Sequence, residues 1–219
     1  MKILLVRPRL IGDVVFTTPL VRVLRRTFPD AELTYVVEPT AAPIVQHNPH
    51  LNHVLVIPKR RGLARLADDV ALGRRLRGGR FDVAVDLHGG PRSAWLTWAS
   101  GAPMRIGYDI RGRTWMYTHP VPRAKTLPPR NSVLNQWDLL APLGIRPGDP
   151  AEDPVEMADD PAAEAHVEQR LREAGIGAAM EKDDVLFCTY RESGVQIMRG
   201  VTMRELLVYW GGDERGSDF

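Results

Sequence analysis

The chain has 219 residues, of which 44% are apolar and 26% charged, with 19 glycines, 18 prolines and one cysteine. These proportions are typical of a globular protein and exclude collagen-like, disordered and disulfide-scaffold classes. Because Cys188 has no second cysteine to pair with, we expect a protein of the reducing cytoplasm without a paired-cysteine metal motif. The first apolar run ends at Arg7, too early for a signal peptide, and no later run is long enough to cross a bilayer.

Charge is distributed unevenly along the chain. Residues 1–148 contain 22 Lys and Arg against 10 Asp and Glu, which gives +12, whereas residues 149–219 carry −10. The basic part predicts an anionic partner, such as a phosphate-bearing substrate, a nucleic acid or an acidic membrane surface, although a solvated arginine-rich face explains it equally well. Prolines and acids gather at residues 146–161 and indicate a linker or domain edge.

Apolar runs alternate with segments of helical periodicity in the basic part. Strands are expected at 2–6, 32–38, 53–57, 82–88 and 105–108, and helices at 12–26, 39–48, 63–79, 93–99 and 131–143. This alternation predicts an α/β fold with a parallel, doubly wound sheet in a domain of residues 1–148. A Pro- and acid-rich linker with a helix, residues 149–180, and a tail, residues 181–219, would follow, with a further strand at 185–189 and a helix at 202–209.

The sharpest local feature follows the first expected strand. Gly12 and Asp13 stand where a helix would begin at the carboxyl end of that strand, which is the ligand-binding edge of open α/β sheets. Gly12 permits close backbone approach, and Asp13 is either the cap of the helix or a carboxylate directed into the crevice. From the residues alone capping is the better interpretation, and neither a dinucleotide fingerprint nor a phosphate-binding Gly-Lys-Ser/Thr loop is present.

Several motifs together resemble glycosyltransferase family 9, the ADP-heptose:lipopolysaccharide heptosyltransferases. They are the first strand with Gly12-Asp13, Thr18-Pro19, Phe28-Pro29, Asn48-Pro49, the segment FDVAVDLH at 81–88, and RIGY at 105–108. The resemblance covers about residues 1–175 and is specific in combination, since each motif is weak alone. It implies a Rossmann-like domain that is the N-terminal, acceptor-binding half of a GT-B fold, with ADP-heptose held mainly by a second domain.

In this family the aspartate of the Gly-Asp turn, here Asp13, is the proposed base that deprotonates the acceptor hydroxyl, and neither a metal nor a cofactor is required. The resemblance thus gives the basic residues an anionic partner, the phosphates and carboxylate sugars of the lipopolysaccharide inner core. Candidate acceptor contacts, besides Gly12, are Lys59, Arg60, Arg61, Arg92, Arg111 and Arg113. Each of these cations could instead serve only to keep the surface soluble. His88 is assigned no catalytic role, because a lone histidine is more often structural.

The tail departs from that family. Residues 181–219 resemble a fragment of the alpha subunit of thiamine-diphosphate-dependent 2-oxo-acid dehydrogenases, through TYRE-x-G at 189–194, RGV at 199–201 and YWGGDERG at 209–216. Tyr190 and Arg191 would correspond to residues that hold thiamine diphosphate, but Ser193 replaces the usual histidine and the magnesium-binding segment is absent. Thiamine binding is therefore not expected, and residues 175–181 read as the junction of two unrelated fragments.

Three functions are compatible with these features. The first is a heptosyltransferase-like acceptor domain with little or no transferase activity, because most of the donor domain is not seen in the sequence. The second is a non-catalytic anion-binding module for lipopolysaccharide, since no nucleic-acid motif is present. The third is a fragment of a thiamine-dependent dehydrogenase. A cytoplasmic location with peripheral contact at the inner membrane fits the basic charge, whereas acceptor identity and oligomeric state stay open.

Overall fold

The computed structural model describes residues 1–58, 62–123, 132–146, 152–157, 187–191 and 194–198, and the single positions 165, 166, 169 and 173. The chain divides into two compact units, residues 1–160 and 161–219. The expected Pro- and acid-rich segment is thus shared between the two units.

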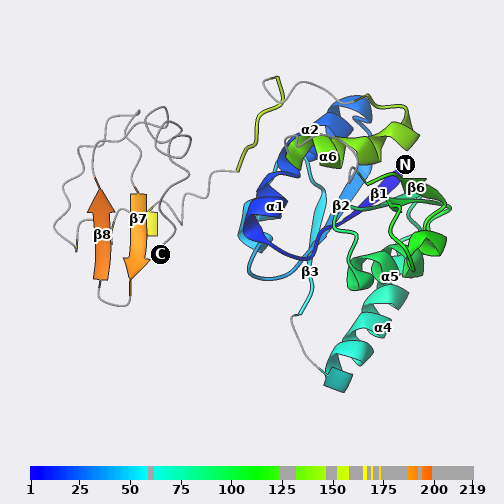
Figure 1. Ribbon diagram of the computed structural model, residues 1–219, viewed down its shortest axis with the longest axis horizontal. Helices are drawn as coiled ribbons and strands as arrows, with labels where there is room; N and C mark the ends of the chain where they lie inside the picture. Colours follow the sequence, from blue (N-terminus) through cyan, green and yellow to red (C-terminus); the bar gives the residue numbers. More distant parts are fainter. Residues whose placement is uncertain are drawn as a thin grey trace. The chain divides into compact units, whose positions relative to one another are not determined.

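The first unit is built on one parallel sheet (Figure 1). Its strands are β1 (Lys2–Val6), β2 (Glu32–Val37), β3 (His53–Val56), β4 (Val83–Asp86), β5 (Met104–Tyr108) and β6 (His119–Val121). They lie in the order β3-β2-β1-β4-β5-β6, and all five pairings are parallel. This is the doubly wound Rossmann order: β2 and β3 are added on one side of β1, and β4, β5 and β6 on the other. The predicted α/β fold with a parallel sheet is confirmed.

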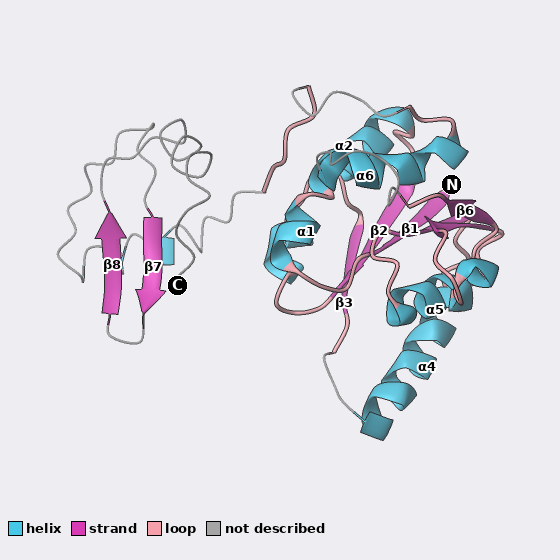
Figure 2. Ribbon diagram, in the orientation of Figure 1, coloured by secondary structure: helices cyan, strands magenta, loops and turns pink. Residues whose placement is uncertain are grey.

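Helices cover both faces of this sheet (Figure 2). One layer contains α1 (Ile11–Val15), α2 (Thr18–Thr27), α3 (Ala42–Gln46) and α6 (Ser132–Trp137), and α6 continues into a 3-10 helix, η2 (Asp138–Leu143). The opposite layer contains α4 (Gly62–Gly78) and α5 (Pro91–Ala99), and η1 (Thr114–Met116) packs beside α5. Side chains of successive strand residues alternate between the two layers, as the pleat requires.

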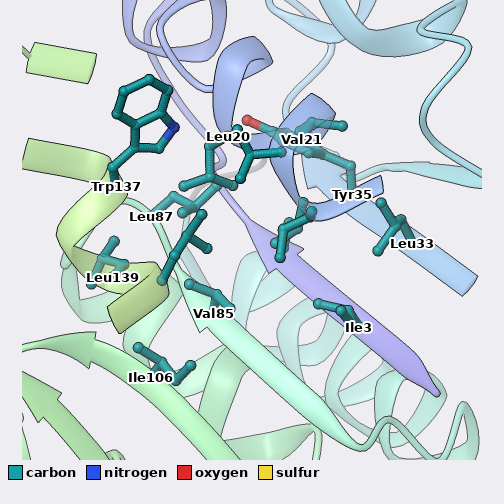
Figure 3. Close-up of a cluster of buried hydrophobic side chains, with 14 of the residues drawn as sticks. Ile3, Leu20, Val21, Leu33, Tyr35, Val85, Leu87, Ile106, Trp137 and Leu139 are labelled. Carbon is teal, nitrogen blue, oxygen red and sulfur yellow. The ribbon is translucent and has the colours of Figure 1, made fainter. Parts of the chain in front are cut away.

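Two apolar clusters hold the layers together. On one face Ile3 and Leu5 join Tyr35, Val85 and the buried Trp137 under α2 and α6 (Figure 3). On the other face Leu4 and Val6 meet residues of α4 and α5. Because β1 and β4 are buried on both faces, they read as continuous apolar runs, and this is why the sequence identified them so well. The clusters fix the carboxyl ends of these strands as a rigid platform.

The structure differs from the expected elements in two places. The single helix expected at 12–26 is two helices, because the chain turns at Thr17 and Pro19 starts the second one. Thr17 is buried, and its hydroxyl donates to the Val14 carbonyl at 2.6 Å and contacts the Tyr35 hydroxyl at 2.8 Å. The sequence analysis also missed η1 and β6, whose residues lack the alternation that marks a strand.

Part of the expected linker packs on the first unit. Asp153 is buried and accepts two hydrogen bonds, at 2.9 and 2.8 Å, from Arg26 of α2. The Glu156 amide donates to the Thr18 hydroxyl at 2.9 Å. Acidic residues of this segment therefore neutralise part of the basic charge of α2.

In the second unit β7 (Phe187–Arg191) pairs antiparallel with β8 (Gly194–Met198). This hairpin overlaps the strand expected at 185–189, whereas the helix expected at 202–209 lies outside the described residues. Among the described residues no helix is long and apolar enough to cross a membrane.

Candidate functional site

The corner between β1 and α1 carries the predicted catalytic residue. Leu10 precedes α1 with φ 68°, a left-handed conformation that is unusual for a branched side chain, and no side chain caps the helix. Asp13 lies in the first turn, beyond the capping position. The capping interpretation of Asp13 was therefore wrong, because its carboxylate points instead to a cation of the neighbouring strand end.

That cation is Arg7, the first residue after β1. Its guanidinium is almost buried, donates to the Leu87 carbonyl at the end of β4, and forms an ion pair with Asp13 Oδ2. The side chain of Asp13 is 33% exposed, and within the described part of the chain no hydrogen bond reaches its Oδ1. One carboxylate oxygen is thus held by a buried cation while the other remains open to a ligand.

Gly12 is not required by the backbone. Its φ is not positive, and a Cβ added to it would meet no atom within 4 Å. Since glycine is unfavourable inside a helix, the fold offers no reason for it here. An open, side-chain-free surface beside Asp13 is instead what the close approach of a ligand needs.

A second charged cluster joins the end of β2 to α4 and α5. Arg92, in the first turn of α5, donates to Glu38 Oε1 at 3.0 Å and to Asp69 Oδ1 at 2.9 and 2.7 Å. Arg9 approaches Glu38 from the exposed side at 3.3 Å. Arg92 does lie at the ligand-binding edge, as expected, but its guanidinium is only 9% exposed and is engaged by two carboxylates. Its geometry is that of a cross-link between elements.

The end of β4 contains another acid, Asp86. It is completely buried and accepts hydrogen bonds from the His88 and Gly89 amides at 2.9 and 2.8 Å, and from the Ser93 and Tyr117 hydroxyls at 3.0 and 2.7 Å. Burial raises the pKa of Asp86, and these hydrogen bonds oppose the rise. Asp86 therefore shapes the loop between β4 and α5.

His88 follows in that loop and is half-buried near the first corner. Burial lowers its pKa; the charge of Arg7 adds to this effect, while the carboxylates of Asp86 and Asp13 oppose it. These effects together favour the neutral imidazole.

The remaining predicted residues lie in loops. Arg111 and Arg113 follow β5, in a loop that adjoins the β4–α5 loop because Ile110 contacts Gly89. Arg111 is exposed, and the partly buried Arg113 has no hydrogen-bond partner for its Nε among the described residues. Lys59, Arg60 and Arg61 lie outside the described residues, and Tyr190 and Arg191 lie in β7. No group of three or more potential metal ligands occurs in the described ranges.

The sequence analysis missed Arg7 and Glu38 as members of the site. Both directly follow strands that are buried on both faces, so each stands at the carboxyl edge of the sheet. A charged residue directly after a buried strand is the signal that would have identified them. A charged side chain that is buried at this edge needs a partner of opposite charge.

Comparison with known proteins identifies the family of the chain. A family model described as "Glycosyltransferase family 9 (heptosyltransferase)" matches residues 70–190, past the junction expected at 175–181. Lipopolysaccharide heptosyltransferase 3 of Escherichia coli is 28% identical over 173 residues, which are 76% of this chain and 49% of that protein. Lipopolysaccharide heptosyltransferase 1 of Pseudomonas aeruginosa is 29% identical over 177 residues, 74% of this chain and 50% of that protein. The chain thus spans about half the length of these curated relatives.

Solved structures share the fold. A family 9 glycosyl transferase from Veillonella parvula superposes with a TM-score of 0.72 at 20% identity, over 81% of this chain and 50% of that one. The E. coli ADP-heptose lipopolysaccharide heptosyltransferase II gives 0.59 at 21% identity, over 84% and 52%. None of these matches supports the resemblance of the tail to a thiamine-dependent dehydrogenase. The family model matches more than half of the chain, and the chain belongs to glycosyltransferase family 9, the heptosyltransferase family.

Proposed function

We propose that the first unit is the acceptor side of an enzyme that transfers heptose from ADP-heptose to the lipopolysaccharide inner core. The observation that carries this proposal is the Asp13 carboxylate, fixed by Arg7 through one oxygen and open at the other, beside the side-chain-free Gly12. The similar proteins are lipopolysaccharide heptosyltransferases, and one of the similar structures is an ADP-heptose lipopolysaccharide heptosyltransferase, which supports this substrate pair.

In the proposed reaction Asp13 is the general base. A hydroxyl oxygen of the acceptor attacks the anomeric carbon of heptose while its proton passes to Asp13 Oδ1. The bond between the anomeric carbon and the phosphate oxygen breaks on the opposite side, so ADP leaves with the bonding electrons and the configuration inverts. Arg7 is a positioning residue, since its fixed guanidinium keeps the carboxylate oriented toward the acceptor.

Arginines near this corner are proposed to bind the anionic groups of the acceptor. Arg111 is exposed, so its donors are available for phosphate or carboxylate. The half-buried Arg113 belongs to the same proposal from its place in the same loop. Lys59, Arg60 and Arg61 belong to the same proposal from their place after β3 in the sequence. Arg92 is proposed to act indirectly by holding α5 to the end of β2 and to α4. Such an acceptor places the protein at the cytoplasmic face of the inner membrane, as a peripheral protein.

The proposal is tested by binding and transfer with one set of variants. A Kdo-bearing lipid A acceptor should bind the chain in isothermal titration, and Arg111→Gln with Arg113→Gln should weaken that binding about tenfold or more. We expect little transfer from ADP-heptose by the chain itself. Asp13→Asn should retain acceptor binding but reduce that transfer about 100-fold or more.

Asp30→Asn is the matched control, because Asp30 is exposed in the turn before β2, at the other edge of the sheet. Binding without transfer would assign the chain acceptor recognition alone. Transfer at the wild-type rate by Asp13→Asn, or no binding of the acceptor, would contradict the proposal.

A further inference from the structure

The outer face of the α4–α5 layer exposes large apolar side chains. Leu66 and Val70 of α4 are 60% and 43% exposed, Trp98 of α5 is 41% exposed, and Trp115 of η1 is 64% exposed. The two tryptophan rings touch edge to face, with centroids 6.0 Å apart and planes at 66°. They come from separate elements that pack together, so the pair is a fixed feature of this surface.

Arginines share the same face. Leu66, Val70, Arg74 and Arg77 succeed each other at three- or four-residue intervals on α4, which places them on one side of the helix. Arg74 and Arg77 are exposed, and the described residues include no ion-pair partner for either. A side chain at Gly101 would meet Arg77 at 3.5 Å, so Arg77 lies next to the end of α5 that carries Trp98.

Acidic side chains are turned away from this face. Neither α5 nor η1 contains an acid, and α4 contains only Asp68 and Asp69. Asp69 is bonded to Arg92 toward the interior, and Asp68 lines the cavity of about 250 Å³ between α4 and β3. Asp109, in the loop before η1, accepts a hydrogen bond from the Thr114 hydroxyl at 2.5 Å. Among the described residues no ion pair joins Arg74 or Arg77 to a carboxylate, so the face combines apolar area with two arginines that are not neutralised.

We propose that this face, formed by Leu66, Val70, Arg74, Arg77, Trp98 and Trp115, binds the surface of an anionic phospholipid bilayer. Tryptophan rings favour the headgroup level of a membrane, and exposed arginines bind lipid phosphates while their stems lie along apolar surface. Each arginine near an anionic surface adds to the attraction, so the charge and the apolar side chains act together. A second copy of the chain fits less well, because a dimer of this face would bring the arginines together.

This inference assigns a surface to the peripheral membrane contact proposed above. It rests on the proposed function only for the expectation that the protein meets a membrane. Its test uses vesicles that contain neither lipopolysaccharide nor nucleotide sugar, so it can fail while the acceptor assay succeeds. The full chain should co-sediment with vesicles of phosphatidylcholine containing phosphatidylglycerol and should bind pure phosphatidylcholine weakly. Tryptophan emission should shift to the blue on binding, and salt should reduce the bound fraction.

Two variants divide the surface into its components. Arg74→Gln with Arg77→Gln should lower the partition coefficient on anionic vesicles roughly 10- to 30-fold. Trp98→Ser with Trp115→Ser should lower it to a similar degree and reduce the blue shift, which a purely electrostatic attachment would not do. The control variants are Arg146→Gln and Met157→Ala, at exposed loop positions outside α4, α5 and η1. Both should bind like the wild type.

Wild-type binding by both double variants would overturn the proposal, as would the failure of the wild type to bind anionic vesicles. A blue shift that depends on protein concentration without lipid, together with dimers in light scattering, would overturn it in favour of self-association.

Discussion

Two aspartates at the same edge of the sheet differ in how many partners their carboxylates have. Asp13 follows β1 and has one cationic partner and one open oxygen, whereas Asp86 ends the adjacent β4 and accepts four hydrogen bonds in a fully buried position. Both would be candidates for chemistry from sequence position alone. The number of donors around each carboxylate separates a group that is free to react from a group that organises a loop.

The same contrast extends to the arginines of this edge. Arg92 is engaged by Glu38 and Asp69, while Arg111 is exposed after β5. We therefore assign structural work to the Asp86 and Arg92 environments and ligand binding to the Asp13 corner with the loop after β5.

The largest effect on stability is expected at Asp86. Asp86→Ala leaves two amides and two hydroxyls without their acceptor, so the free energy of unfolding should fall by about 3–5 kcal/mol. Asp13→Asn keeps an oxygen for Arg7 and should cost about 1 kcal/mol or less. Urea denaturation of the two variants measures this difference. Similar losses for both would show that Asp13 is also structural.

The next comparison is between two arginines. Arg92→Met removes the more buried of the two cations that contact Glu38, together with the partner of Asp69, and should destabilise the fold by about 2–4 kcal/mol. Arg111→Met should change stability by less than about 0.5 kcal/mol but weaken binding of the Kdo-bearing acceptor severalfold. Thermal denaturation and acceptor titration are needed for both variants. An Arg92→Met protein of normal stability would refute the assignment of Arg92 as a cross-link.

The pH dependence of stability should report the burial of Asp86. Since burial raises its pKa in the folded state, the folded protein binds the proton more tightly than the unfolded chain does. Stability contributed by this group is therefore largest at low pH and falls as pH rises from about 4 through the folded-state pKa. The stability advantage of wild type over Asp86→Asn, measured by urea denaturation at several pH values, should shrink over that range. An advantage that grows with pH would show that the folded-state pKa is lowered.

The smallest effect on stability is expected at Gly12. Because a Cβ there meets nothing within 4 Å and the backbone is helical, Gly12→Ala should leave stability unchanged or raise it by up to about 1 kcal/mol. Its acceptor affinity should nevertheless fall, since the methyl group occupies the open surface beside Asp13. Gly107→Ala is the contrasting variant, because its Cβ would clash with the Tyr117 ring, so this change should destabilise the fold. Unchanged affinity in Gly12→Ala would remove Gly12 from the site.

Much of this architecture could be predicted from the sequence, because the central strands are buried on both faces and read as continuous apolar runs. The position of Asp13 followed from the same reasoning, and the family resemblance supplied a role for it. The segment that forms η1 and β6 was missed because its aromatic and polar residues show neither strand nor helix periodicity.

The pairing of charges could not be predicted from local sequence. Arg92 finds Glu38 and Asp69 at separations of 54 and 23 residues, and Asp86 meets Tyr117 at 31 residues. Arg7 was not predicted as a member of the site, although it directly follows a buried strand. Only the folded chain shows which cations at the sheet edge are already neutralised and which remain open to a ligand.

Hydrogen exchange of the chain with and without a Kdo-bearing lipid A acceptor is the most direct test of the central claim. We predict slower exchange at residues 10–16 and 109–113 on binding, with residues 86–93 already protected in the free protein. Protection that appears only along β3 and α4, with none at residues 10–16, would contradict the assignment of the Asp13 corner as the acceptor site.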